Sequence, residues 1–262
     1  MKSQSIHQST ITAHLALCTA LALPAQASAG DAESYRTMGD QYYFGTGVSQ
    51  NYSRAFEFYK DAERLGDLPA TQYIGYMYQH GLGVSTDHEK ALYWYAKAAE
   101  RGHEGAQYSL GYMHEYGVGT VINYAESRRW YEAAARQGHV TAMRQLGQIY
   151  ARGLGVEPNL HQAAYYTALA AEQGDPTAAQ HLERFVPHLQ ILEVQVAGQE
   201  IYKEPGQRPV DSLSPGDIVY QLANPEGEWF TVYDPLKRGL GYVKVDAFIP
   251  TAATAAGLAS NN

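Results

Sequence analysis

The sequence predicts an α+β multidomain protein, in which an α-helical solenoid of about four helix pairs plus a capping helix precedes a small β-barrel. Three observations predict this order. Glycines recur every 36 residues between Gly39 and Gly174, and alanine and aromatic residues recur at the same interval. After Pro187, short runs of branched residues replace the repeat. A fixed period of this size is typical of stacked helical units, and short strand-like runs are typical of small β domains.

The composition is that of a folded protein. The chain has 262 residues, of which 45% are hydrophobic and 18% charged. Its formal net charge is -8, from 27 acidic and 19 basic residues. A negative chain has no general electrostatic attraction for nucleic acid or anionic lipid, so we expect neither as a partner.

Residues 1–29 have the pattern of a secretory signal peptide. Lys2 precedes a mostly apolar run from Ile11 to Leu23, and alanines then offer cleavage after Ala27 or Ala29. We expect an exported, periplasmic or extracellular bacterial protein with no transmembrane segment in its mature chain; a retained membrane anchor is the alternative. The only cysteine, Cys18, lies in this segment. The mature chain then has no disulfide and no cysteine-ligated zinc.

The glycines define a two-helix unit. They form four columns, which are Gly39, Gly75, Gly111 and Gly147; Gly45, Gly81, Gly117 and Gly153; Gly47, Gly83, Gly119 and Gly155; and Gly66, Gly102, Gly138 and Gly174. The first column lies in a predicted first helix, where it lets the second helix approach, with Ala70, Ile74 and Tyr78 on one buried face. The next two columns form the interhelical turn, and the last ends the second helix in a left-handed conformation.

The second helices are predicted to begin at residues that accept hydrogen bonds from free amides. These residues are Asn51, Asp87, Asn123 and Asn159. Glu126 and Gln162 stand three positions later and are expected to complete capping boxes. Within each second helix a large residue is expected to pack against a small one: Phe58, Trp94, Trp130 and Tyr166 precede Ala62, Ala98, Ala134 and Ala170 by four positions.

These residues resemble the Sel-one-like repeat (SLR) family, which is related to the tetratricopeptide repeat. The resemblance covers residues 34–185, and Ala70 to Gly102 meets the family pattern most fully. The third repeat departs from it at His114, Thr120 and Ser127. A half-repeat from Asp175 through Phe185 is expected to cap an SLR domain of residues 30–186.

The segment after Pro187 resembles the bacterial SH3-like domain. Strands are predicted at Leu189–Val196, Asp217–Leu222, Trp229–Tyr233 and Gly241–Val245, with Asn224 to Gly227 as a hairpin turn. Gly216–Val219, Glu228–Val232 and Gly241–Val243 match the family's strands, with Tyr242 in place of a tryptophan. We expect the barrel over residues 187–250 and a disordered tail over 251–262.

Catalytic motifs are absent from the sequence. His103-Glu104 and His114-Glu115 begin like a zinc-protease helix, but Gln107 and Val118 stand where the second ligand belongs. His103 and His139 are expected to be surface turn residues, and His114 a satisfied buried imidazole. We therefore expect no enzyme, no metal and no cofactor.

Binding is the expected activity, through a groove lined by the first helices. If Ala70, Ile74 and Tyr78 face the core, the opposite side forms repeating columns of tyrosine and arginine, residues favoured at binding hot spots. The candidate partner-binding residues are Arg36, Asp40, Phe44, Gln72, Tyr73, Tyr76, His80, Tyr108, Tyr112, Tyr116, Arg144, Gln148 and Arg152. The alternative is that these tyrosines only cover the neighbouring helix. A peptide, a partner's helix and a glycan all remain open as ligands.

Two function classes follow from the resemblances. SLR repeats imply a non-enzymatic adaptor or scaffold for a protein partner in the cell envelope. The SH3-like module implies, as the alternative, a cell-wall binding protein that engages peptidoglycan and recruits or regulates a cell-wall enzyme.

Overall fold

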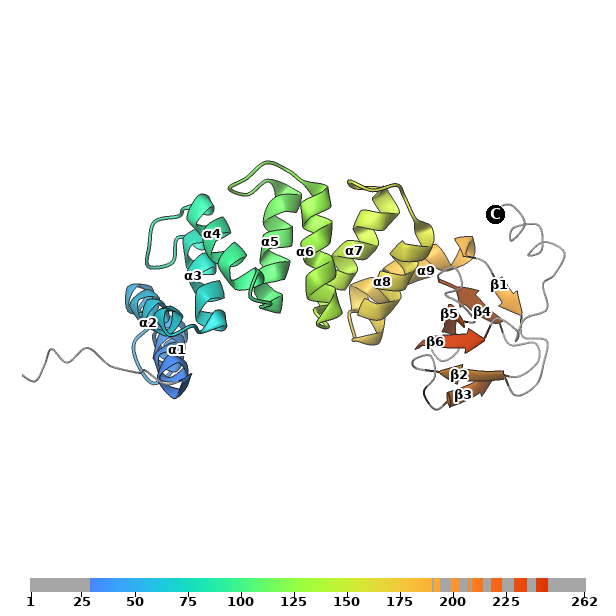
Figure 1. Cartoon of the computed structure of the whole chain (residues 1–262), viewed down its shortest axis with the longest axis horizontal. Helices are drawn as coiled ribbons and strands as arrows, with labels where there is room; N and C mark the ends of the chain where they lie inside the picture. The colour runs from blue at the N-terminus through green and yellow to red at the C-terminus, as the bar shows by residue number, and fades with distance from the viewer. Residues whose placement is uncertain are drawn as a thin grey trace, which may run out of the picture. The chain divides into compact units, whose positions relative to one another are not determined.

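The computed structural model describes the whole of the predicted helical region and parts of the C-terminal segment. The described residues are 29–189, 191–193, 199–202, 207, 209–213, 218–222, 229–234 and 239–244. The predicted signal peptide, the hairpin turn at 224–227 and the tail at 251–262 lie outside them, apart from Ala29. The chain divides into two compact units, one ending at Thr86 and the other beginning at Asp87. Figure 1 labels the elements of both units.

The first unit contains three helices. They are α1 (Ala29–Phe44), α2 (Tyr52–Arg64) and α3 (Leu68–His80). Each packs against the next along the chain. Its core includes Tyr59, Ala70 and Ile74, all fully buried.

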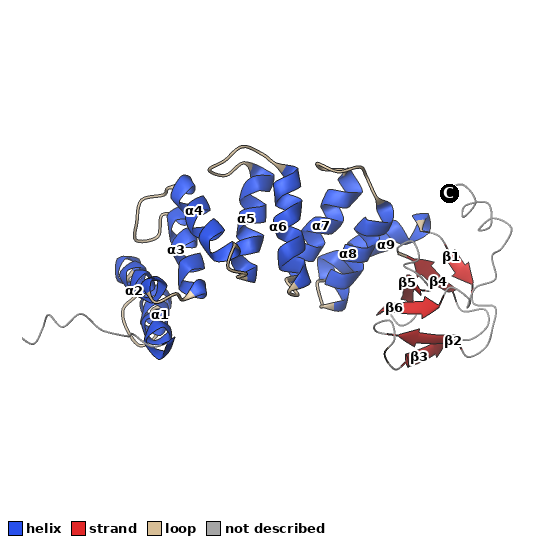
Figure 2. Ribbon diagram, viewed as in Figure 1, coloured by secondary structure: helices blue, strands red, loops and turns tan. Residues whose placement is uncertain are grey.

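The second unit continues the same helix pairs. Its helices are α4 (His88–Ala99), α5 (Glu104–Tyr116), α6 (Tyr124–Arg136), α7 (Val140–Arg152), α8 (Leu160–Glu172) and α9 (Pro176–Phe185), followed by the short 3₁₀ helix η1 (Val186–His188). Consecutive helices pack against one another, and α9 lies beside α8 as the predicted half-repeat. The described residues thus contain nine α-helices, which pack in succession within each unit and are drawn in blue in Figure 2.

The predicted starts of the second helices are confirmed. The side chains of Asn51, Asp87, Asn123 and Asn159 each accept a hydrogen bond from the backbone N–H three residues later. The predicted capping boxes are not formed. The backbone N–H of Asn123 donates to the carbonyl of His114 and that of Asn159 to the carbonyl of Tyr150, so neither needs a side-chain acceptor. Glu126 instead accepts hydrogen bonds from Arg129.

The first glycine column allows close helix packing, as predicted. A Cβ atom on Gly111 would come 2.7 Å from the ring of Tyr131, and one on Gly39 would come 2.6 Å from the ring of Tyr59. The other three columns have positive φ throughout, which confirms the predicted turns and helix ends. The third column has a further role, because a Cβ on Gly119 would come 2.5 Å from the carbonyl oxygen of His88.

The buried large residue of the second helices lies one position after the predicted one. Tyr59, Tyr95 and Tyr131 are fully buried, whereas Phe58, Trp94, Trp130 and Tyr166 are half-buried on the neighbouring stripe. The reason is that Tyr59 lies between Ala55 and Ala62 at spacings of four and three, which places all three on one helix face. The predicted small residues, Ala62, Ala98, Ala134 and Ala170, are fully buried.

The C-terminal segment forms a small antiparallel sheet. Its described strands are β1 (Ile191–Glu193), β2 (Gln199–Tyr202), β3 (Pro209–Leu213), β4 (Ile218–Gln221), β5 (Trp229–Asp234) and β6 (Gly239–Lys244), in the order β1-β4-β5-β6-β2-β3. All described pairs are antiparallel. Closure into the predicted barrel is not shown, since β1 and β3 stand at the two edges of this order.

The sheet and the last helices share an apolar cluster. Ala164 and Ala168 of α8, Leu182 of α9, Leu189 and Leu222 are all buried in it. The backbone N–H of Leu240 in β6 donates to Glu172 Oε1 at 2.6 Å. Within the second unit, the described strands therefore pack directly against the helical repeats.

Candidate partner-binding surface

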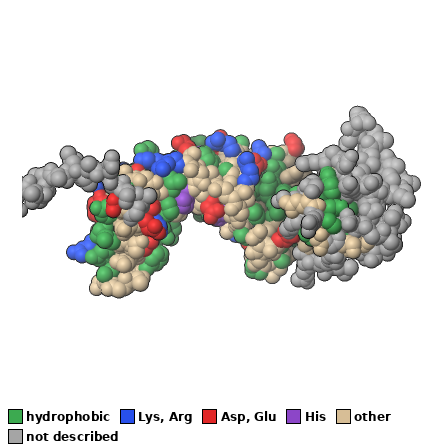
Figure 3. Space-filling model, turned by 60° about the horizontal axis from the view of Figure 1, so that its bottom comes forward, with side chains coloured by type: hydrophobic (Ala, Val, Ile, Leu, Met, Phe, Trp, Pro, Cys, Tyr) green, Lys and Arg blue, Asp and Glu red, His purple; other side chains and the backbone are tan. Residues whose placement is uncertain are grey.

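All thirteen candidate residues lie on first helices, and none is fully buried. Helix α1 carries Arg36, Asp40 and Phe44; α3 carries Gln72, Tyr73, Tyr76 and His80; α5 carries Tyr108, Tyr112 and Tyr116; α7 carries Arg144, Gln148 and Arg152. Phe44, Tyr76, His80, Tyr116 and Arg152 are exposed, and the others are half-buried. Figure 3 shows one face of the molecule, where hydrophobic side chains are interspersed with acidic and basic ones.

Arg36 and Arg144 are held in equivalent ion pairs. Arg36 Nε donates to Asp67 Oδ2 at 3.1 Å, and Arg144 Nε donates to Asp175 Oδ2 at 3.0 Å. Asp67 and Asp175 cap α3 and α9, because each accepts a hydrogen bond from a backbone N–H of its helix through Oδ1. The two arginines predicted to border the ligand surface thus each join a first helix to the start of the next one.

In the third repeat the helix-capping position of Asp67 and Asp175 is occupied by His139, whose ring stacks on Tyr108. His139 Nδ1 accepts a hydrogen bond from the Ala142 N–H at 3.2 Å and caps α7. Its imidazole stacks on Tyr108 with the ring centroids 4.6 Å apart. Burial lowers the pKa of His139, and the nearby carboxylate of Glu104 opposes that shift. His139 is therefore a structural cap and not the surface turn residue that was expected.

His103 has the same role in the second repeat, since its Nδ1 accepts from the Ala106 N–H at 3.2 Å. Sequence reasoning missed this column of caps, Asp67, His103, His139 and Asp175. The sequence pattern could have revealed it, because the four residues recur at the repeat interval directly after the last glycine column.

The first unit brings its candidate residues together through aromatic contacts. Tyr43 contacts Phe44 and Tyr73 with centroid distances of 4.8 and 5.7 Å, and Tyr73 stacks on Tyr59 at 5.0 Å. Burial, together with the neighbouring tyrosines, raises the pKa of Tyr43 to about 12. Its hydroxyl is therefore a neutral hydrogen-bonding group at physiological pH. Tyr43 was not among the predicted residues, yet it connects them.

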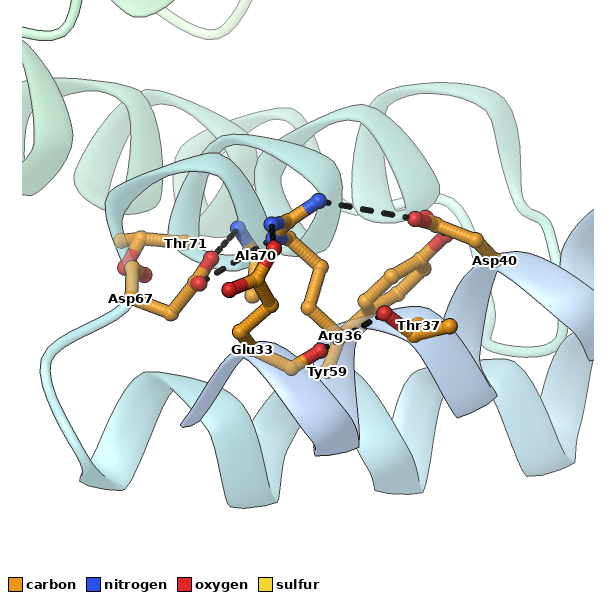
Figure 4. A network of polar contacts seen from close by, with 8 residues as sticks. All are labelled: Glu33, Arg36, Thr37, Asp40, Tyr59, Asp67, Ala70 and Thr71. Atoms are coloured by element: carbon orange, nitrogen blue, oxygen red, sulfur yellow. Dashed lines mark hydrogen bonds and ion pairs between the residues drawn. The ribbon is translucent and has the colours of Figure 1, made fainter. Parts of the chain in front are cut away.

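Asp40 contacts both a buried and a charged neighbour. Its Oδ1 accepts a hydrogen bond from the Tyr59 hydroxyl at 2.8 Å, while Oδ2 lies 3.7 Å from Arg36 Nη1. Figure 4 shows Arg36 among the carboxylates of Glu33, Asp40 and Asp67. This arrangement anchors α1 to both α2 and α3.

In the second unit helix α5 carries a buried carboxylate next to two of its candidate tyrosines. Glu115 accepts a hydrogen bond from the Tyr131 hydroxyl at 2.8 Å and another from Gln145 Nε2 at 3.4 Å. Tyr112 and Tyr116 of the same helix contact each other, with ring centroids 4.6 Å apart. Glu115 and Gln145 were not predicted, because their side chains fall outside the columns chosen for the exposed face.

The irregular third repeat contains three unsatisfied polar atoms. Among the described residues, His114 Nδ1, Ser127 Oγ and Arg128 Nε are buried side-chain atoms without a hydrogen-bond partner. The expectation that His114 is a satisfied imidazole is therefore wrong. Burial lowers its pKa, Glu126 opposes the shift and Arg129 adds to it.

Two further kinds of feature are absent from the part of the chain that the structure describes. No group of three or more His, Cys, Asp or Glu side chains in the described residues is placed to hold a metal ion. None of the described helices is long and apolar enough to cross a membrane.

The stacked helix pairs define a helical-repeat protein, and the comparisons with known proteins give its family. Four consecutive matches to the Sel1 repeat model, at residues 32–67, 69–103, 105–139 and 140–175, cover more than half of the chain. The chain belongs to the Sel1 repeat family. The strands that follow lie outside these matches.

Two solved structures are similar to this chain over its repeats. One is c5321, a protective antigen present in uropathogenic Escherichia coli strains and displaying an SLR fold, with 36% identity and a TM-score of 0.59 over 61% of this chain and 34% of that chain. The other is a Sel1 repeat protein from Oxalobacter formigenes, with 34% identity and a TM-score of 0.57 over 59% of this chain and 63% of that chain. The match thus spans about a third of the first and less than two thirds of the second. The comparison with curated proteins gave no match.

Proposed function

We propose that this protein is a non-enzymatic, exported adaptor that binds a protein or peptide partner in the cell envelope through its first helices. The observation that carries the proposal is the exposure of large aromatic side chains on these helices: Phe44 is 59%, Tyr76 36% and Tyr116 52% exposed. Burying a large aromatic side chain is favourable, and aromatic residues dominate interface energetics. Family membership supports the proposal, because solenoid repeats present extended surfaces to partners.

The experiment is a crosslinking pull-down from bacterial envelope extract, followed by reconstitution with the purified partner. The variant removes three exposed rings by Phe44→Ala, Tyr76→Ala and Tyr116→Ala, and the half-buried ring beside Tyr116 by Tyr112→Ala. The matched control is Tyr93→Ala, which removes a tyrosine that is 59% exposed on the second helix α4. We expect the four-fold variant to lose the partner while its circular dichroism stays helical, and the control to keep it. If the four-fold variant still captures the partner, the binding surface does not lie at these four residues.

Export rests on the signal-peptide pattern of residues 1–29. Expression in a bacterial host followed by N-terminal sequencing of the periplasmic or secreted protein tests it. We expect a chain that begins at residue 28 or 30. An uncleaved chain held in the membrane fraction would favour the retained anchor.

The second candidate function is peptidoglycan binding by an SH3-like module in residues 187–250. It is supported by the antiparallel pairing of β4, β5 and β6, which coincide with three of the predicted strands. It predicts that the full chain sediments with isolated peptidoglycan and that a chain ending at Phe185 does not. Equal sedimentation of the two chains would remove the C-terminal segment from this function.

A further inference from the structure

We propose that the aromatic face of the first unit binds a basic peptide segment, and that it seats a lysine or arginine side chain against exposed rings and carboxylates. We define this aromatic face as Tyr43, Phe44, Tyr73, Tyr76 and His80, which lie on α1 and α3. The proposal rests on the proposed adaptor function and assigns the chemistry of the partner at one of its surfaces.

The aromatic face is continuous. Tyr43 contacts both Phe44 and Tyr73, and Tyr76 contacts His80 with ring centroids 4.2 Å apart. Tyr43 also lies close enough to Tyr76 for Tyr76 to raise its pKa. A partner side chain that reaches any of these rings is therefore within reach of the others.

The rings that end this face are open to solvent, although their neighbours are packed. Phe44 is 59% exposed and Tyr76 36%, while Tyr59, which supports Tyr73 from α2, is fully buried. Each of these rings is held by its neighbours, while part of its surface remains exposed to solvent. A partner can therefore bury that surface without a large loss of side-chain entropy in this protein.

The charged cluster that precedes the aromatic face along α1 has a net negative charge. One guanidinium, that of Arg36, faces the three carboxylates of Glu33, Asp40 and Asp67 at 3.4, 3.7 and 3.1 Å. Helix α3 contains no aspartate, glutamate, lysine or arginine that would change this balance. Asp40 lies on the same helix as Phe44, one turn earlier, so a negative charge borders the exposed rings.

Charge and aromatic surface together favour a cation. The faces of tyrosine and phenylalanine rings attract ammonium and guanidinium groups, and a nearby carboxylate adds Coulombic attraction. An acidic segment would be repelled by the same carboxylates. The first helix α7 of the second unit differs, because its exposed Arg152 is basic and its Arg144 is paired with Asp175. The preference for a basic segment is therefore assigned to the first unit and not to α7.

The test measures fluorescence anisotropy with the full chain and a labelled hexapeptide of alternating lysine and leucine. A hexapeptide with glutamate in place of lysine is the charge control. The ring variant is Phe44→Ala with Tyr76→Ala, and the charge variant is Asp40→Asn, which keeps an oxygen acceptor for the Tyr59 hydroxyl. Matched controls are Tyr93→Ala, a ring on the second helix α4 that is 59% exposed, as Phe44 is, and Asp61→Asn, an acid on α2.

We expect the lysine peptide to bind and the glutamate peptide not to bind. The ring variant should weaken binding about fivefold to tenfold, because it removes two exposed cation–π contacts. The charge variant should weaken binding about threefold to fivefold, because it removes one carboxylate beside the cation. Both controls should bind as the unchanged chain does, and added salt should weaken binding.

Three results would overturn this inference. They are equal binding of the glutamate peptide, unchanged binding by both variants, and no binding of the lysine peptide by a chain that still captures its envelope partner. In the last case the adaptor function stands and only the assignment of a basic segment fails. Loss of the partner and of the peptide together would overturn both proposals.

Discussion

The Nε atom of Arg144 lies 3.0 Å from Asp175 Oδ2, 31 residues further along the chain. The other oxygen of the same carboxylate accepts hydrogen bonds from the N–H groups of Thr177 and Ala178 at the start of α9. One aspartate therefore both caps α9 and holds α7, the first helix of the preceding pair. The side chains of the pair are 25% and 13% exposed, so solvent screens the interaction only in part.

Asp175→Ala is expected to lower the free energy of unfolding by about 1–2 kcal/mol, because it removes the cap and the ion pair together. Arg144→Gln leaves the cap in place and is expected to cost less than about 1 kcal/mol. Urea unfolding followed by circular dichroism measures both. Lys90→Gln is the control, since the Lys90–Asp87 pair is more exposed, and a cost equal to that of Arg144→Gln would contradict the structural role.

His139 is expected to make stability fall as the pH is lowered. Burial lowers its pKa, with Glu104 opposing, so the unfolded state binds more protons below about pH 6.5. The contribution of His139 is thus fully present above the unfolded pKa and is lost as the pH falls through the folded pKa. Protonation also removes the Nδ1 acceptor that caps α7.

His139→Asn keeps a side-chain cap that does not titrate in this range. Unfolding free energies between pH 7.5 and 5 should therefore decrease less in this variant than in the unchanged chain. His114→Asn is the comparison, because burial lowers the pKa of His114 as well. Identical pH profiles for His139→Asn and the unchanged chain would show that the cap is not sensitive to protonation.

Ser127→Ala is expected to raise the free energy of unfolding by about 1 kcal/mol. The hydroxyl of Ser127 is buried without a partner, and alanine occupies the same position in the other repeats. Thr71→Val is the matched control, because the buried Thr71 hydroxyl donates to the Asp67 carbonyl at 2.7 Å, and its loss should lower stability. A destabilising Ser127→Ala would contradict this prediction, because it would show that the Ser127 hydroxyl makes a favourable interaction in the folded protein.

Gly111→Ala should lower stability by about 1–3 kcal/mol, because the new Cβ would meet the ring of Tyr131 in a packed interface. Gly138→Ala has open space around its Cβ and is destabilised only by its positive φ of 95°, by about 1–2 kcal/mol. Thermal unfolding of each variant together with the double variant Gly111→Ala/Tyr131→Leu separates the two causes. If the cost of Gly111→Ala is steric, it should be smaller when Tyr131→Leu has removed the ring.

The repeat was predictable because each glycine column has a local cause that does not depend on distant contacts. The start of α4 at Asp87 and the positive φ of Gly102 follow from neighbouring residues alone. The choice between Trp94 and Tyr95 as the buried residue depends on about 100° of helix rotation, which two adjacent aromatic residues leave open. The spacing from Ala91 to Tyr95 and Ala98 would have resolved it.

The candidate surface was predictable in position but not in contacts. Once the core-facing residues of a helix are known, the helical period identifies the residues on the opposite face, and it places Tyr76 and Tyr116 there. It does not reveal that Arg36 is held by Asp67, because that pair joins successive repeats. Histidine caps such as His139 were missed because aspartate, asparagine and serine are the usual acceptors at helix starts. Strands β2 and β3 were missed because neither has a clear alternation of apolar residues.

The third glycine column allows successive repeats to pack through the same kind of junction. Gly155 lies against Tyr124 in the same way that Gly119 lies against His88, so each turn fits the start of the second helix in the preceding repeat. Removal of residues 104–139 would bring the turn at Gly155 to the helix start at His88, where a turn of the same form already fits. The chain can therefore lengthen or shorten by whole units of one glycine period without a new kind of junction, and a break within a turn would disturb two units at once.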